Sequence, residues 1–208
     1  MRDLLLLFLI VALVYGFGLG RASLWDAEEG IYAEIIRQMA QSGDWVVPVY
    51  NGAPRFDQPP LMLWIGALAV RALGPTELAV RLGSFVLALL SVALVYAFGR
   101  RLHSRGAGVI AALVLPATLA WFMMGRMGVM DTGLSFFVGL SVYQLARIAD
   151  AVAPARFGAR TGLAGPYFWL GVATALSVLA KGPAALLLVG GTALFFFGPR
   201  RLGKLLWR

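Results

Sequence analysis

Long apolar stretches alternate with short polar segments along most of this chain. The apolar stretches cover residues 4–20, 78–98, 107–122, 129–146, 167–180 and 184–197. Uninterrupted windows of about 17–20 apolar residues are typical of membrane-spanning helices, because a soluble helix needs apolar residues on only one face. The pattern predicts an all-α integral membrane protein, a multi-span helical bundle with its first span at residues 4–20 and the others within residues 78–198. A signal peptide is the alternative interpretation of residues 4–20.

Helix breaks are predicted at two places, one inside a stretch and one between two stretches. Pro116 removes a backbone donor from the stretch over residues 107–122 and should kink it. Lys181-Gly182-Pro183 separates the last two stretches, which are short for full spans. Short or broken helices are common where membrane helices line a cavity.

The one long polar segment, residues 22–77, follows the first apolar stretch. Its first part predicts a helix over residues 26–41, with Asp26 as N-cap and Glu29 in capping-box spacing. At 100° per residue, one face of this helix is polar and carries Glu34, Arg37 and Gln41. The opposite, apolar face carries Tyr32, Ile35, Met39 and, unexpectedly, the carboxylate of Glu28. A carboxylate on a buried stripe is costly unless it is paired or used.

The rest of the polar segment predicts an extended piece and a second helix. Residues 45–50 are rich in β-branched and aromatic side chains and end at an Asn51-Gly52 turn. Residues 59–73 begin with proline and are followed by Gly74-Pro75, which predicts a helix too short for a comfortable span. We therefore expect two juxtamembrane helices in the first external loop.

The basic residues indicate how the bundle is oriented. Residues 100–105, 147–160 and 200–208 are rich in arginine, and all three segments lie on one side if the spans alternate. Cytoplasmic loops carry the excess of Lys and Arg, so the N-terminus is predicted to be cytoplasmic. The acidic loop, Arg126 with Asp131, and Lys181 would then share the extracytoplasmic face.

Composition excludes several classes of function. The chain is 60% hydrophobic and 13% charged, with a mean hydropathy of +0.81. It has no cysteine and a single histidine, His103, so neither a thiolate site nor a multi-histidine metal centre is expected. The net charge of +8 comes from basic residues at segment ends, which does not favour nucleic-acid binding. Phosphate-binding glycine loops and nucleophile elbows are missing too, which disfavours a nucleotide-driven cytoplasmic enzyme. We expect no metal and no cofactor.

Each candidate residue also has an ordinary structural explanation. Glu28 is either a functional base or a first-turn acid favoured by the helix dipole, and Glu29 is either a ligand or a helix cap. Asp57 and Asp131 could likewise be N-caps. Lys181 and Arg126 could simply extend their charges from a membrane end to water, although Gln58 and Lys181 both lie beside predicted helix starts, where anions bind.

Taken together, these segments resemble bacterial lipid-linked glycosyltransferases of the aminoarabinose transferase and protein O-mannosyltransferase superfamily. The resemblance runs in consistent order through residues 25–64, ELAVRLGSF, GRMGVMDTGLSFF and LAKGPAALLL. It implies the GT-C fold over residues 1–208, and a chain equivalent to the N-terminal part of longer members, with a C-terminal half or partner subunit missing. It also implies transfer of a sugar from a polyprenyl-phosphate carrier on the outer side of the bacterial inner membrane, for lipid A or protein glycosylation.

The resemblance assigns roles to residues at matching positions. Glu28, with Asp57 and Asp131, would form the catalytic group, with Glu28 as general base. The substrate-binding residues would be Glu29, Tyr32, Arg55, Gln58, Arg126 and Lys181. Two cations common in the family are replaced here, by Ile31 and Gln58. A non-catalytic, carrier-binding membrane subunit of the same fold is therefore the alternative function, and a transporter is less favoured because the charges lie near the span ends.

Overall fold

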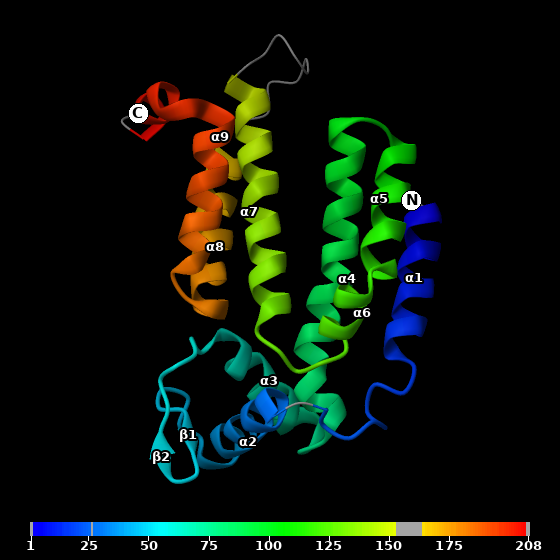
Figure 1. Ribbon diagram of the computed structural model, residues 1–208, viewed down its shortest axis with the longest axis vertical. Helices are drawn as coiled ribbons and strands as arrows, with labels where there is room; N and C mark the ends of the chain where they lie inside the picture. The colour runs from blue at the N-terminus through cyan, green and yellow to red at the C-terminus, as the bar shows by residue number, and fades with distance from the viewer. Residues whose placement is uncertain (1, 26, 153–163, 207–208) are drawn as a thin grey trace.

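The protein is almost entirely helical. The computed structural model describes residues 2–25, 27–152 and 164–206, which form helices and one short hairpin (Figure 1). In chain order the elements are α1 (Arg2–Gly16), α2 (Ala27–Ser42), β1 (Val49–Tyr50), β2 (Ala53–Pro54), α3 (Leu61–Leu73), α4 (Glu77–Leu102), α5 (Arg105–Ala117), α6 (Leu119–Met124), α7 (Asp131–Val152), α8 (Ala164–Lys181) and α9 (Ala184–Leu206).

Two groups of long helices stand side by side, and smaller elements cover one end of them. Helices α1, α4 and α5 pack together, α7, α8 and α9 form the second group, and α4 contacts α7. Helices α2 and α3 and the β1–β2 hairpin lie across the lower end in Figure 1, where α3 also contacts α8. The turn between α4 and α5 lies at the opposite end. The long polar segment of the sequence therefore folds as a cap on one end of the bundle.

Of the described helices, α4 alone is both long and apolar enough to cross a membrane. It has 26 residues and a mean hydropathy of 2.3 over its most apolar window. The apolar parts of α1, α3, α5 and α9 are shorter. All the predicted apolar stretches are helical, but α1 ends at Gly16 and not at residue 20, because the chain turns at Gly18 with a φ of 69°.

Both predicted helix breaks are confirmed. The stretch containing Pro116 divides at Thr118, which is extended and separates α5 from α6. The last two stretches are separated at Gly182, whose φ of 90° ends α8 before α9 begins. A third interruption, at Gly198 inside α9, was not predicted.

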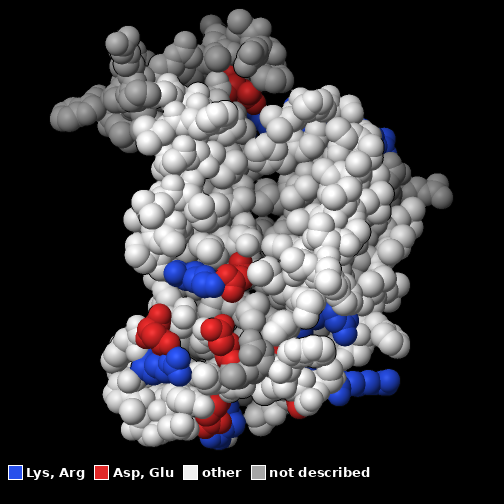
Figure 2. Space-filling view, viewed as in Figure 1, with Lys and Arg blue, Asp and Glu red and all other residues white. Residues whose placement is uncertain are grey.

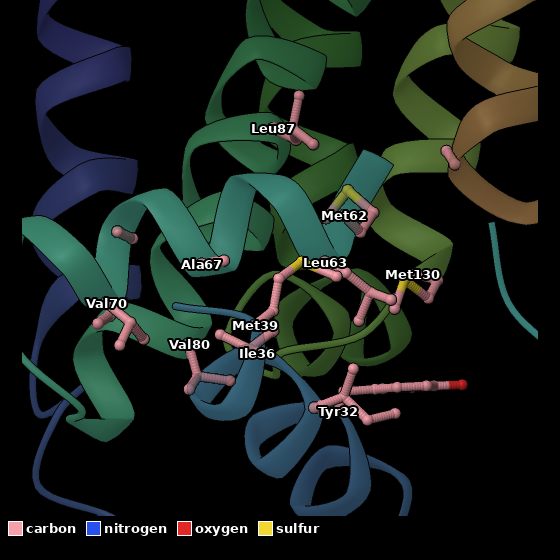
Figure 3. Packing of buried hydrophobic residues seen from close by; sticks show 14 of the residues in the cluster. Tyr32, Ile36, Met39, Met62, Leu63, Ala67, Val70, Val80, Leu87 and Met130 are labelled. Carbon is pink, nitrogen blue, oxygen red and sulfur yellow. The ribbon is translucent and has the colours of Figure 1, made fainter. Parts of the chain in front are cut away.

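The faces of α2 agree with the helical pattern except at its first turn. Side chains on the polar face bond one another, since Arg37 donates to Glu34 at 2.8 Å and to Gln41 at 2.6 Å. The apolar face packs against α3 in the main core, where Tyr32, Ile36 and Met39 meet Met62 and Leu63 (Figure 3).

The carboxylate buried at the first turn of α2 is not the predicted one. Glu28 is exposed, whereas Glu29 has no exposed surface. The prediction that Glu28 lies on the buried stripe is thus wrong, because α4 brings Arg81 to the side of α2 that carries Glu29. The capping prediction for Asp26 lies outside the described residues.

The hairpin is shorter than the sequence suggested. Asn51 and Gly52 have φ angles of 51° and 79°, as a tight hairpin turn requires, so this turn is confirmed. Residues 45–48 are not in a strand, because the Asp44 carboxylate accepts the backbone N–H groups of Val46 and Val47 and bends the chain there.

Candidate functional site

Four segments that are distant in sequence meet beside the cap. A methyl group on Gly133, near the start of α7, would lie 2.6 Å from the Met62 sulfur on α3 and 3.4 Å from Ala180 on α8. A methyl group on Gly182 would lie 3.8 Å from Pro59. The starts of α3 and α7 and the end of α8 therefore converge, and α2 packs on α3 next to them.

An ion pair joins α8 to α7 at this point. The Lys181 ammonium donates to the Asp131 carboxylate, and each side chain is 36% exposed. Asp131 is the first residue of α7 and Lys181 the last of α8, so each charge also interacts favourably with its own helix dipole. The pair is fixed in place but remains open to solvent and to a ligand.

A second ion pair precedes α3. Arg55 donates to both Asp57 carboxylate oxygens, at 2.7–2.9 Å, and these hydrogen bonds lower the pKa of Asp57. Asp57 does not cap α3: the helix begins at Leu61, and its N-cap residue, Pro60, provides no side-chain hydrogen bond. The capping explanation for Asp57 is therefore wrong, and the first N–H groups of α3 have no side-chain cap.

Tyr32 lies among the predicted catalytic carboxylates. Its ring packs in the core, and its hydroxyl points away from the other labelled side chains (Figure 3). Burial raises the pKa of Tyr32, and the negative charges of Glu28, Asp57 and Asp131 raise it further. All three predicted catalytic carboxylates therefore lie within electrostatic range of this one phenol.

Of these carboxylates, Glu28 alone has no cationic partner among the described residues. Asp57 is paired with Arg55 and Asp131 with Lys181, whereas Glu28 is exposed and forms no hydrogen bond or ion pair with the described part of the chain. Gln58, which follows Asp57 in the sequence, is half-buried. Figure 2 shows that charged side chains on the visible face gather toward this lower end, below a largely uncharged middle.

Behind this surface, Glu29 and Arg81 form a fully enclosed ion pair. Arg81 donates to Glu29 at 2.8 and 2.9 Å, and the two side chains are 3% and 0% exposed. Burial alone would raise the pKa of Glu29, but hydrogen bonds from Arg81, Gly128 and Trp25 outweigh it and hold the pKa below its usual value. Because Glu29 is enclosed, its predicted contact with substrate has no route through the described surface.

Arg81 is the important residue that the sequence analysis missed. A lone arginine in the first turns of a long apolar helix was the available clue, because such a charge requires a partner once it is buried.

Arg126 is occupied elsewhere. Its guanidinium donates to the backbone carbonyl groups of Tyr15, at 2.5 Å, and Val14, at 3.3 Å, near the end of α1. It also lies 5.2 Å from the centre of the Phe122 ring. A cation at a helix C-terminus is stabilising, so the structure gives Arg126 a clear role in holding α1, separate from the Lys181–Asp131 pair.

The chemistry available here is acid–base and electrostatic. No group of three or more acidic or histidine side chains within the described residues is placed to hold a metal ion. A hollow of about 220 Å³ lies on the polar face of α2, lined in part by Glu34, Arg37 and Glu77. Its lining does not include Glu28, Tyr32 or Lys181. This hollow is therefore distinct from the charged surface, by which we mean Glu28, Asp57, Asp131 and Lys181.

Comparisons with known sequences show which family and which relatives the chain is similar to. A family model described as dolichyl-phosphate-mannose-protein mannosyltransferase matches residues 57–207. An uncharacterized protein of Aquifex aeolicus is 29% identical over 99% of the chain and 40% of its own length. A protein of Sodalis glossinidius named undecaprenyl phosphate-alpha-4-amino-4-deoxy-L-arabinose arabinosyl transferase 2 is 35% identical over 86% of the chain and 32% of its own length.

The fold is similar to that of two solved structures. ArnT from Cupriavidus metallidurans bound to undecaprenyl phosphate superposes with a TM-score of 0.76 at 23% identity, covering 92% of this chain and 39% of that protein. Its apo state gives a TM-score of 0.75. The nearly all-helical architecture is thus that of the ArnT fold, and the chain spans about a third to two fifths of the length of the relatives it matches.

Proposed function

Because the chain belongs to the dolichyl-phosphate-mannose-protein mannosyltransferase family, we propose that it is the sugar-transferring part of a membrane glycosyltransferase. The donor would be a polyprenyl phosphate carrying a sugar, and the acceptor a lipid, protein or glycan on the extracytoplasmic face. The relative from Sodalis is named for transfer from undecaprenyl phosphate, and a related structure holds that carrier. The observation that carries the proposal is the meeting of the starts of α3 and α7 with the end of α8, where Asp131 pairs with Lys181. The charges of Glu28, Asp57 and Asp131 all act on Tyr32 next to this point.

Glu28 is the best candidate for general base. Transfer requires a carboxylate that accepts the proton of the acceptor hydroxyl as the new glycosidic bond forms. Glu28 is exposed and has no ionic partner within the described residues, whereas Asp57 and Asp131 are each neutralised by a cation. Asp57 and Asp131 would orient the sugar and hold the two cations in place, and Tyr32 would offer its hydroxyl to the sugar.

The leaving phosphate needs positive charge and hydrogen-bond donors. Lys181 and Arg55 supply two cations, and the uncapped start of α3 supplies backbone N–H groups next to Gln58. This arrangement stabilises charge that develops on the phosphate as the sugar departs. Arg126 and Glu29 contribute indirectly, since both are engaged with other parts of the protein.

We also propose a membrane arrangement. The long helices would lie in the bacterial inner membrane with the N-terminus in the cytoplasm, and α2 and α3 would be juxtamembrane helices on the outer side (Figure 1). The charged surface would then meet a lipid carrier at the membrane edge.

Two substitutions favour a second candidate function. Ile31 and Gln58 stand where the family often has cations, so fewer charges face the phosphate. A subunit that binds the carrier without transferring its sugar would tolerate that loss.

The Glu28→Gln variant tests the enzymatic function. We expect purified protein in liposomes to transfer aminoarabinose from its undecaprenyl-phosphate carrier, and Glu28→Gln to reduce the rate by about 10²-fold or more, because the proton acceptor is lost. Carrier binding should persist in the variant.

Glu34→Gln is the matched control, since Glu34 is on the same helix but pairs with Arg37. Unchanged transfer by Glu28→Gln would remove Glu28 as the base. Carrier binding without transfer by the wild type would favour the non-catalytic alternative.

A further inference from the structure

We propose that the buried Glu29–Arg81 ion pair is a positioning device that fixes Glu28 on α2 relative to Asp131 on α7. The inference rests on the proposed function, because it concerns the alignment of the base with the donor site. Glu29 and Arg81 touch no substrate and would act through the residues they hold.

Arg81 ties α4 to the chain that leaves α1. One of its terminal nitrogens donates to the carbonyl groups of Leu19 and Ala22, each at 2.8 Å, and the other donates to Ser23 at 2.9 Å. The remaining donors reach Glu29. A single guanidinium therefore binds three backbone carbonyl groups and one carboxylate, which the planar fork of arginine allows and a lysine ammonium cannot reproduce.

Glu29 ties α2 to the loop before α7. One carboxylate oxygen accepts the backbone N–H of Gly128 at 2.8 Å, and the other accepts that of Trp25 at 2.8 Å. The same loop is held from α4 by the Ser84 hydroxyl, which donates to the Val129 carbonyl at 3.0 Å. The Gly128 contact is tight, because a methyl group there would lie 2.7 Å from a side-chain carbon of Val80.

The two ends of this network are the proposed catalytic groups. Glu28 directly precedes Glu29 on α2, and Asp131 follows Gly128 by three residues at the start of α7. Any shift of α2 against the loop would change the separation between Glu28 and the Asp131–Lys181 pair. A misplacement of about 1 Å can cost about 10²-fold in rate.

Stability alone is a weak reason for such a pair. Replacing a buried ion pair with apolar residues of similar volume is often neutral or stabilising, whereas its directional bonds specify one arrangement. Here those bonds join α2, α4 and two loops that share no continuous secondary structure.

The test measures geometry and catalysis in the same variants. The chain contains no cysteine, so Ser42→Cys on α2 and Met127→Cys in the loop can be spin-labelled and their separation measured by double electron–electron resonance. We expect one narrow distance distribution in the parent chain and a broad one with Glu29→Gln or Arg81→Lys. The exposed pair supplies the control, Glu34→Gln, which should leave the distribution narrow.

Kinetics then separate positioning from binding. Glu29→Gln should lower kcat by about 10²-fold and change the KM for undecaprenyl-phosphate-linked aminoarabinose by less than about three-fold, since no substrate contact is lost. Glu29→Asp keeps the charge and should recover part of kcat. If Glu29→Gln does not fold, Glu29→Asp takes its place, with an intermediate broadening expected.

The outcomes distinguish this inference from the proposed function. A narrow distribution in Glu29→Gln or its replacement, or an unchanged kcat, overturns the positioning role. A broad distribution in a chain whose wild type transfers no sugar supports the role of the pair in geometry and rejects the enzymatic function instead.

Discussion

Neighbouring acids on α2 lie in opposite environments, and this difference separates their roles. Glu28 is exposed and pairs with no side chain in the described part of the chain, while Glu29 is enclosed and accepts hydrogen bonds from α4 and two loops. A proton acceptor must reach its substrate, whereas a positioning group must be held rigidly. Consecutive residues of a helix point about 100° apart, so one turn can serve both needs.

The lowered pKa of Glu29 predicts how stability depends on pH. A carboxylate whose pKa is lower in the folded state than its ordinary value of 4.5 stabilises the fold above that pH. That contribution is lost as the pH falls from 4.5 through the folded-state pKa. We expect the free energy of unfolding, measured with denaturant in detergent at several pH values, to drop in this window.

Glu29→Gln should remove part of that drop. It should also cost about 3–5 kcal/mol at neutral pH, because it leaves Arg81 buried without its counter-ion. An identical pH dependence in wild type and variant would contradict the assignment.

Gln58 allows a gain-of-function prediction. Gln58→Lys adds a cation beside Asp57 and the uncapped start of α3, so it should tighten binding of undecaprenyl phosphate about ten-fold, as expected for one charge-assisted hydrogen bond. Gln41→Lys adds the same charge at the far, exposed end of α2 and should have no effect. Binding can be measured by microscale thermophoresis, and equal affinities in both variants would reject the phosphate site.

Local pattern predicted the faces of α2 better than the pairing of its charged side chains with other elements. The faces of α2 followed from its own spacing, since Glu34, Arg37 and Gln41 bond within one helix. The Glu29–Arg81 pair joins residues 52 positions apart, and helical periodicity contains no information about such a contact. The misplacement of Glu28 on the buried stripe has the same origin.

At the scale of elements, α4 and α5 approach so closely that their backbones touch. A methyl group on Gly108 of α5 would lie 2.7 Å from the Tyr96 carbonyl oxygen and 3.0 Å from the Arg100 nitrogen on α4. Backbone atoms cannot move aside as the end of a side chain can. Small residues allow the same kind of close packing between many membrane helices.

Gly108→Ala should therefore destabilise the protein by about 1–3 kcal/mol through overpacking. Gly106→Ala, on the same helix, would place its methyl group 3.8 Å from the nearest neighbouring atom, the Ser104 oxygen. That variant should be neutral or more stable by up to about 1 kcal/mol, because alanine favours helix. Thermal unfolding of both variants checks the contrast, and equal losses would contradict it.

The existence of elements was easier to predict than their ends. Pro116 and Gly182 act on the backbone directly, so their breaks were visible in the sequence. By contrast, the limits of α1 and the interruption at Gly198 in α9 depend on turns that apolar composition does not specify.

At the scale of the whole molecule, the acidic cap and the arginine-rich α4–α5 turn occupy opposite ends (Figure 1). This polarity predicts the orientation in the membrane. Because the chain has no cysteine, single cysteines can report the side on which each end lies. Ser42→Cys on the cap should react with a membrane-impermeant maleimide in intact spheroplasts, and His103→Cys only after permeabilisation. The reverse labelling would place the charged surface in the cytoplasm and reject the proposed topology.

Helix α4 is anchored at both of its ends. Near one end Arg81 binds Glu29, and near the other Arg101 donates to Asp150 of α7 at 2.8 Å. These anchors are 20 residues apart in the same helix, or roughly 30 Å along its axis. Sliding α4 along its own axis would strain both contacts at once, so α4 is held against α2 near one end and against α7 near the other. Under the proposed function, entry of a long lipid tail would then depend on movement of α8 and α9, because the Glu29–Arg81 pair also ties α2 of the cap to α4.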